Sequence, residues 1–199
     1  MKCDIILAGV GGQGILTIAT IIGKAALKSN MNIRQAEIHG MSQRGGDVQS
    51  DLRISTSEIF SDLIPKGEAD VIVSMEPMEA LRYLLRLSPQ GWVVTNTTPF
   101  INVTDYPETS SLDAELAKLP RVVKLDIDRA AKELGAPRSA NIVLLGALTP
   151  FIHLPKEALE EAVADHFARK GEAVVAQNIA AFRYGYETAE KNTLYNTIK

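Results

Sequence analysis

The stretch CDIILAGVGGQGIL, residues 3–16, carries the strongest local signal of fold in the sequence. Its apolar first half ends in glycine, which is typical of a buried parallel strand. From Gly12 to Ser29, isoleucines and alanines recur at helical spacing, so a helix follows the glycines. The stretch therefore predicts a buried strand, a glycine-rich turn and a helix.

The glycines of this turn fit the spacing G-x-G-x-x-G at Gly9, Gly11 and Gly14, with a fourth at Gly12. Such a turn lets a ligand approach the backbone, and the helix N-terminus offers unpaired N–H groups to a phosphate. Two interpretations stay open: an anion-binding loop, or a turn that serves packing alone. A Walker A loop is excluded because no Lys-Ser/Thr pair follows the glycines.

The remaining pattern predicts an α/β fold. Residues 32–40 read as a second strand, which would complete a strand–helix–strand unit with parallel strands. Residues 45–55 alternate, which favours an edge or antiparallel strand with one wet face. Further strands are expected at 69–75, 91–97 and 121–127 with a short ribbon at 101–107, and helices at 76–87, 129–135, 139–152, 155–167 and 171–191. We expect one domain over residues 1–199, a three-layer Rossmann-like mixed sheet with one or more antiparallel edge strands and a helical C-terminal part at about 139–193.

Composition excludes several function classes. The chain has 199 residues, a formal net charge of −3 and 46% hydrophobic residues, so it offers no basic field for nucleic acid. No apolar run approaches the roughly 20 residues that span a bilayer, and the N-terminus does not resemble a signal peptide. We expect no nucleic-acid or membrane partner and a cytoplasmic location.

The single cysteine, Cys3, excludes an intrachain disulfide and a complete four-thiolate iron–sulfur cluster. It lies in the first apolar run, so we expect a buried, unreactive thiol. Any electron-carrying metal centre must then belong to another chain.

A second glycine-containing segment, EIHGMSQRGG, follows the second strand from Glu37 onward. Glu37 stands where a dinucleotide-binding fold would place its ribose-binding acid. The segment also brings Gly45, Gly46 and the cation Arg44, and we expect it to lie beside the first glycine loop. This pairing favours a long phosphate-bearing ligand or a partner surface over adenosine ribose, and a solvated turn remains the plain alternative.

Three segments in order, AGVGGQG, EIHGMSQRGGDVQSDLRIS and NIVLLGAL, resemble the gamma-type subunit of 2-oxoacid:ferredoxin oxidoreductases (the pyruvate, ketoisovalerate and indolepyruvate enzymes). The resemblance spans roughly residues 3 to 187 and is nearest to the small, beta subunit of the indolepyruvate enzymes. It implies oxidative decarboxylation of a 2-oxoacid on thiamine diphosphate, electron transfer through iron–sulfur clusters to ferredoxin, and release of an acyl-CoA.

The resemblance also implies how this work is divided. The sequence has no Gly-Asp-Gly motif followed by Asn that would hold thiamine diphosphate and Mg²⁺, and too few cysteines for a cluster. Both groups would therefore belong to a larger partner subunit. The gamma-type chain would complete the complex and share in binding coenzyme A.

The family's two glycine loops and the Asn that opens its later apolar helix have counterparts here. These candidate coenzyme A residues are Gly9, Gly11, Gly12, Gln13, Gly14, Ser42, Gln43, Arg44, Gly45, Gly46 and Asn141. We expect the loop N–H groups and Arg44 to meet phosphate or pantetheine amides. Asn141 either contacts the same ligand or caps its own helix.

Other polar residues carry weaker signals. His39 suits a turn, and His153 and His166 lack companions at metal-ligand spacing, so no metal site is expected. Glu76 and Glu79 suit a helix start better than an acid–base pair. We therefore assign no catalytic residue to this chain.

Two other functions remain as alternatives. The glycine loop with Glu37 would suit a self-sufficient NAD(P)-binding oxidoreductase, and a ligand-free docking scaffold would use the glycines for packing alone. In isolation we expect a homo-oligomer, because apolar surface meant for the partner would be exposed.

Overall fold

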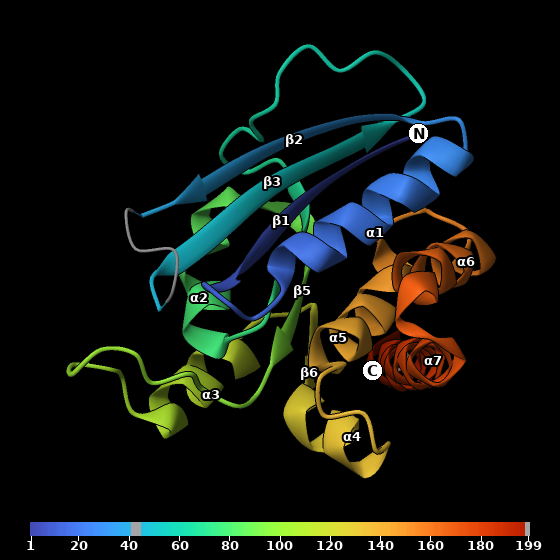
Figure 1. Ribbon diagram of the computed structural model, residues 1–199. Helices are drawn as coiled ribbons and strands as arrows, with labels where there is room; N and C mark the ends of the chain where they lie inside the picture. Colours follow the sequence, from blue (N-terminus) through green and yellow to red (C-terminus); the bar gives the residue numbers. More distant parts are fainter. Residues whose placement is uncertain (41–44, 198–199) are drawn as a thin grey trace.

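The computed structural model describes residues 1–40 and 45–197, with side chains as far as residue 192. In this part of the chain six strands form one mixed sheet in the order β2–β3–β1–β4–β5–β6 (Figure 1). The strands are β1 (Lys2–Val10), β2 (Asn32–His39), β3 (Asp47–Ser55), β4 (Ala69–Ser74), β5 (Leu87–Asn96) and β6 (Val122–Leu125). The helices are α1 (Ile15–Lys28), α2 (Pro77–Arg82), α3 (Thr109–Ala117), α4 (Ile127–Glu133), α5 (Ala140–Leu148), α6 (Lys156–Phe167) and α7 (Glu172–Thr197), with 3-10 turns η1 (Leu84–Arg86), η2 (Thr149–Phe151) and η3 (Ala168–Lys170).

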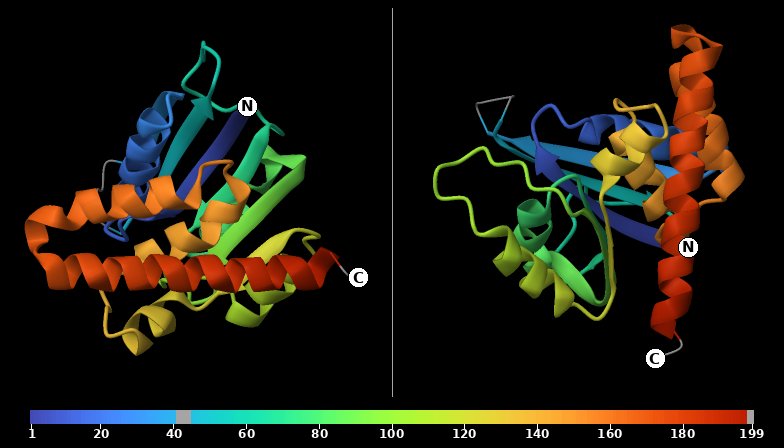
Figure 2. Two further views of the ribbon diagram at one scale, coloured as in Figure 1. Left: turned by 90° about the vertical axis from the view of Figure 1, so that its right-hand side faces the viewer. Right: turned by 90° about the horizontal axis from the view of Figure 1, so that it is seen from below.

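Helices cover both faces of the sheet, which confirms the predicted three-layer α/β class. Successive side chains of a strand point to opposite faces, so β1 sends Ile5 and Leu7 into one core cluster and Ile6 into the other. The larger cluster joins the sheet to α1 and α4–α7, and the smaller one joins it to α2 and α3. Figure 2 shows α6 and α7 crossing the face of the sheet that α1 also covers.

The position of β3 differs from the prediction. It is antiparallel as expected, but it lies between β1 and β2 and pairs with both along its length. The strands β1 and β2 are therefore not neighbours in a parallel strand–helix–strand unit, and β2 forms the edge of the sheet. The expected wet face is also wrong, because Gln49 and Asp51, two residues of the polar face, are buried.

Two arginine–carboxylate pairs explain how polar residues come to lie inside this region. Arg86 donates two hydrogen bonds to the fully buried Asp51, at 3.1 and 2.6 Å. Arg53 donates two to the equally buried Asp4, at 2.8 and 3.0 Å. Bidentate pairing satisfies the carboxylate oxygens that burial removes from water. The period-2 pattern of residues 45–55 thus correctly predicted a strand. The polar side chains of this strand contact other side chains instead of solvent.

Several element boundaries also differ. Residues 101–107 form no strand but part of a loop, and α3 follows where no helix was predicted. The helix expected over 76–87 ends as α2 and η1, because β5 already begins at Leu87. The C-terminal helices match the expected segments, with α5 opening the helical part at Ala140.

Cys3 is buried, as predicted, and burial raises the pKa of its thiol above the usual range. This holds the sulfur in its unreactive protonated form. None of the helices in the described part of the chain has the length and apolar composition needed to cross a membrane.

The helices α5 and α7 meet at two glycines. A Cβ atom added to Gly146 would lie 2.0 Å from the carbonyl oxygen of Phe182, and one added to Gly185 would lie 1.9 Å from that of Val143. No side chain fits at either position, so the two backbones approach as closely as they do only because both residues are glycine.

Gly146→Ala should therefore lower the free energy of unfolding by about 3 kcal/mol or more, because the added methyl group forces α5 and α7 apart. Urea unfolding followed by circular dichroism measures the free energy of unfolding. Gly40→Ala is the matched control, since nothing lies within 4 Å of its added Cβ. Equal stability of the two variants would contradict the close approach.

Candidate functional site

The predicted glycine loop connects β1 to α1. The loop is closed by its own amide, since Gln13 Oε1 accepts from Val10 N at 2.7 Å and Gln13 N donates to Val10 O at 3.1 Å. Gly14 occupies the N-cap position of α1 in a left-handed conformation, with φ of 86°. That conformation favours glycine, because a Cβ atom would be strained there.

Gly9 serves packing. A Cβ atom added to Gly9 would lie 2.6 Å from Ile15 Cδ1 and 2.8 Å from Gln13 Oε1. Without a side chain at Gly9, the first turn of α1 and the amide of Gln13 rest directly on the end of β1. Gly9 therefore shapes the loop by letting Ile15 and Gln13 pack against the end of β1.

The second glycine segment lies against the first, as predicted. Gly11 N donates to Gly46 O at 2.9 Å, and Gly45 N donates to Gly11 O at 3.4 Å. The described part of the second loop is thus hydrogen-bonded to the first in both directions. Ser42, Gln43 and Arg44, the other candidates of this segment, lie outside the described residues.

Asn141 ties the glycine loop to a distant helix. It lies in the first turn of α5, and its Nδ2 donates to Gly14 O at 3.2 Å. The N-cap position of α5 belongs to Ser139, so the proposed capping role of Asn141 is wrong. Its Oδ1 makes no hydrogen bond within the described residues and stays available to a ligand.

Two clefts flank the glycine loop. The first, which we call the sheet-edge cleft, has a volume of about 380 Å³ and lies between the loop, α1 and the ends of β2 and β3. The second, the inter-helix cleft, has a volume of about 420 Å³ and lies between the loop, α5 and the residues after β5. Both volumes are in the range of small-molecule sites. Gly12 and Gly14 line both clefts.

A loop that sequence patterns missed borders the inter-helix cleft. Its residues 98–100 line the cleft, and Phe100 N and the Tyr106 hydroxyl both donate to the buried carboxylate of Glu76. Desolvation, followed by this hydrogen bond, raises the pKa of Tyr106. Asn102 Nδ2 reaches the second glycine loop at Gly45 O, 2.8 Å away. Sequence periodicity does not predict these contacts, because single residues of an irregular segment make them.

The weaker candidates take structural roles. Glu76 caps α2 by accepting from Glu79 N at 2.9 Å, and Glu79 pairs with Arg82 at 2.8 Å, which confirms the helix-start interpretation. His39 is exposed at the end of β2, with Nδ1 3.0 Å from Gly40 O. Within the described residues, no three His, Cys, Asp or Glu side chains gather as metal ligands. The cation Arg138, which sequence reasoning passed over, lines the inter-helix cleft.

Comparison with known proteins places this architecture in a family. The sequence profile described as pyruvate ferredoxin/flavodoxin oxidoreductase matches residues 4–188. The indolepyruvate oxidoreductase subunit IorB of Archaeoglobus fulgidus is 37% identical over 95% of this chain and 96% of its own length. The chain belongs to the pyruvate ferredoxin/flavodoxin oxidoreductase family.

Within the family the chain is of the small-subunit, gamma type. It covers 99% of a keto/oxoacid ferredoxin oxidoreductase gamma subunit from Geobacter sulfurreducens, at 28% identity and a TM-score of 0.70. The 2-oxoglutarate synthase subunit KorC of Methanocaldococcus jannaschii is 31% identical over 96% of both chains. The fold also recurs in the 2-oxoglutarate:ferredoxin oxidoreductase of Magnetococcus marinus, with a TM-score of 0.74 at 23% identity, where this chain spans only 31% of that longer chain.

The contact between Gly14 and Asn141 can be tested by a double-mutant cycle. Gly14→Ala should cost about 1–3 kcal/mol through its positive φ, and more because the new Cβ would lie 2.6 Å from Asn141 Nδ2. Removing that amide with Asn141→Ala should relieve the clash, so the double variant should be more stable than the sum of the single costs predicts.

Gly12→Ala combined with Asn141→Ala is the control for this cycle. Gly12 also has a positive φ, 103°, but nothing lies within 4 Å of its added Cβ. Its cost and that of Asn141→Ala should simply add. Additive costs in the Gly14 cycle as well would contradict the contact between Gly14 and Asn141.

Proposed function

We propose that this chain is the small subunit of a coenzyme A-dependent oxidoreductase that decarboxylates an aryl pyruvate such as indolepyruvate and passes electrons to ferredoxin. The substrate class rests on the relatives named as indolepyruvate oxidoreductase subunits, which are 35–37% identical over nearly the whole chain. The 2-oxoglutarate relatives are more distant, at 25–31%.

Thiamine diphosphate, Mg²⁺ and the iron–sulfur clusters belong to a large partner subunit in this proposal. One buried cysteine cannot ligate a cluster. The partner subunit supplies the chemistry of decarboxylation and the path of electrons to ferredoxin. This chain completes the complex, and coenzyme A is the ligand that its own residues bind.

The residues on both sides of the glycine loop fit coenzyme A. The observation that carries this assignment is that Gly12 and Gly14 line both clefts, so the two clefts flank one loop within reach of a single long ligand. Within the described residues, no hydrogen bond uses the N–H of Gly12 or Gly14. The N-terminus of α1 adds a partial positive charge at the same place. Gly9 stays a shaping residue in this assignment.

The reconstitution of activity tests the division of labour. The isolated chain should show no 2-oxoacid-dependent reduction of a viologen dye, and adding the large subunit should restore it. Indolepyruvate should give a higher kcat/KM than pyruvate or 2-oxoglutarate in the assembled complex. Activity of the lone chain, or tight saturable NADH or NADPH binding by fluorescence, would favour the self-sufficient dehydrogenase instead.

Substitutions in the two loops test coenzyme A binding. In the assembled complex, Gly12→Ala and Arg44→Ala should each raise the KM for coenzyme A while leaving the KM for the 2-oxoacid unchanged. Gly12→Ala acts by placing a methyl group in the space of both clefts and by straining a φ of 103°. Loss of assembly with unchanged kinetics per complex would instead favour a ligand-free docking scaffold.

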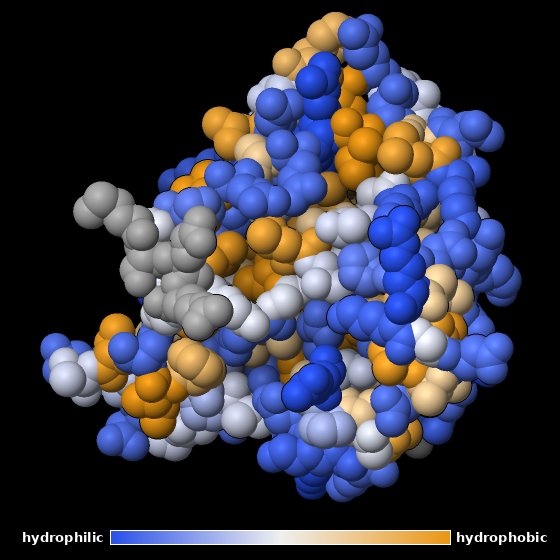
Figure 3. Space-filling model, in the orientation of Figure 1, coloured by the Kyte–Doolittle hydropathy of each residue, from blue (hydrophilic) through white to orange (hydrophobic). Residues whose placement is uncertain are grey.

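The exposed apolar side chains support association of the isolated chain. Ile101 and Val103 project from the loop before α3 with 70% and 50% exposure, and Phe60 is 89% exposed on the loop after β3. Figure 3 shows apolar surface gathered in separate patches on this face of the molecule. Multi-angle light scattering of the lone chain should therefore report a dimer or larger species. A monomer at high concentration would contradict it.

A further inference from the structure

The loop between β5 and α3, residues 97–108, carries a group of exposed apolar side chains. Phe100, Ile101 and Val103 are 44%, 70% and 50% exposed, so three large apolar side chains face solvent within four residues. Figure 1 shows this β5–α3 loop extending away from the sheet beside α3. Single exposed apolar residues are common on protein surfaces, whereas exposed apolar residues that lie together mark contacts with a partner.

Hydrogen bonds to the rest of the protein hold the β5–α3 loop in place. Phe100 N and the Tyr106 hydroxyl both donate to the carboxylate of Glu76, which is fully buried. Between these two anchors, Asn102 Nδ2 donates to Gly45 O at 2.8 Å. A partner would therefore meet apolar side chains that are already positioned, which lowers the entropy lost on binding.

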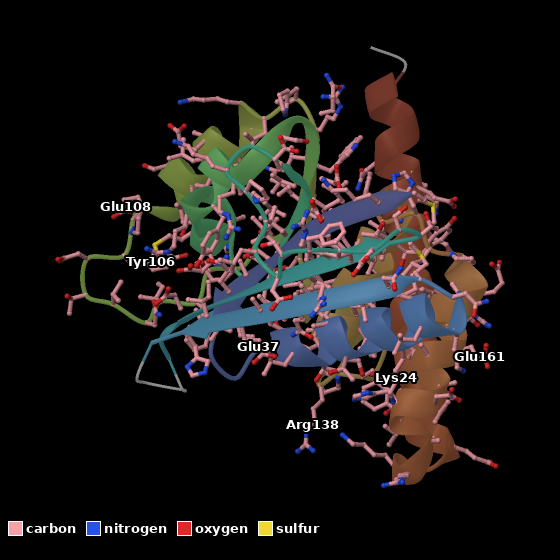
Figure 4. The ribbon with its side chains drawn as sticks, turned by 90° about the horizontal axis from the view of Figure 1, so that it is seen from above. Lys24, Glu37, Tyr106, Glu108, Arg138 and Glu161 are labelled. Atoms are coloured by element: carbon pink, nitrogen blue, oxygen red, sulfur yellow. The ribbon has the colours of Figure 1, made fainter. Side chains whose placement is uncertain are left out.

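The same loop carries two carboxylates that have no partner within the described residues. Asp105 and Glu108 are exposed, and their side chains make no hydrogen bond or ion pair there. Figure 4 shows Tyr106 and Glu108 where the loop returns to α3. Asp113, within α3, differs because the ammonium of Lys124 lies 2.9 Å from its carboxylate. The exposed apolar group is therefore bordered by unpaired negative charge.

These features fit a partner chain of another kind better than a second copy of this chain. Two copies that met through the β5–α3 loop would bring like charges together, which is unfavourable across an interface. A partner with lysine or arginine beside an apolar pocket would complement both the charge and the apolar group. The indolepyruvate and 2-oxoglutarate relatives are themselves named as subunits, which supports a partner of another kind.

We propose that the β5–α3 loop is the site at which the large subunit docks. Ile101 and Val103 enter an apolar pocket of that subunit. Lysine or arginine side chains at the rim of the pocket pair with Asp105 and Glu108. An apolar centre inside a polar, charged rim is the usual anatomy of a protein interface. This inference rests on the small-subunit role proposed above, and it adds the surface through which the complex assembles.

Binding of the full chain to the separately purified large subunit, measured by biolayer interferometry, tests the apolar contact. Ile101→Ser should raise the Kd at least about tenfold, as expected for an anchor at the centre of an interface. Phe60→Ser is the matched control and should leave the Kd unchanged. Phe60 is 89% exposed on the loop after β3, at the opposite end of the sheet from the β5–α3 loop.

The salt dependence of association tests the charged rim. Attraction between opposite charges mainly speeds association, and salt screens it. Association of the unsubstituted chain should therefore slow as the salt concentration rises. The double variant Asp105→Asn, Glu108→Gln should associate more slowly at low salt and lose most of this dependence, with little change in the dissociation rate. Association of this variant that is equally fast or faster would overturn the proposed partner chemistry.

The remaining outcomes separate the docking site from the subunit role. An unchanged Kd for Ile101→Ser would overturn the site, and a raised Kd for Phe60→Ser would place docking on the loop after β3 instead. If Ile101→Ser left that Kd unchanged but converted an oligomer of the lone chain to a monomer in light scattering, the occupant would be a second copy. If the unsubstituted chain did not bind the large subunit, the small-subunit role itself would fail.

Discussion

The absence of side chains at the junction of β1 and α1 is the constraint on which the site depends. Gly9 lets the first turn of α1 rest on the strand end, and Gly14 leaves room for the amide of Asn141. Because Asn141 then holds Gly14 O, the N-terminus of α5 is placed beside that of α1. One backbone turn thus fixes the relative position of two helices that are more than a hundred residues apart in the chain.

Two ion pairs with buried carboxylates hold β3, the strand that follows the second glycine segment. Asp51 and Asp4 lie on adjacent strands, β3 and β1, and each is held by an arginine that also donates to carbonyls of the loop after β3. Buried pairs of this kind add little net stability, because desolvation offsets much of the attraction. Their consequence here is positional: Arg53 ties β3 to Asp4 of β1, and Arg86 of η1 ties Asp51 of β3 to the segment that follows α2.

These two constraints together shape the surroundings of the glycine loop. The glycine loop lies between two clefts, of which one is lined by Arg138 and Asp128 and the other by Glu37 and His39. The curated relatives are themselves named as subunits of larger enzymes. A loop that borders the inter-helix cleft also carries exposed apolar residues, so apolar surface lies next to this cleft.

Local order could be predicted from the sequence. The strand, glycine turn and α1, the C-terminal helices and the burial of Cys3 follow from periodicity, glycine spacing and composition, which act over a few residues. The two glycine segments were expected to meet, because both follow strands that end at one edge of the sheet. Gly45 and Gly46 do meet Gly11.

Only the tertiary structure decided the long-range partners. The alternation in β3 correctly predicted a strand. The pattern of polar and apolar residues does not tell whether a polar side chain contacts water or an arginine, so the burial of Asp51 was missed. Asn141 could bind a ligand or cap a helix until the end of α5 was placed against Gly14. Arg138 lies in no motif and joined the site only through the packing of α5 beside the loop. Sequence patterns determine what each segment is, whereas chain packing determines which side chains become neighbours.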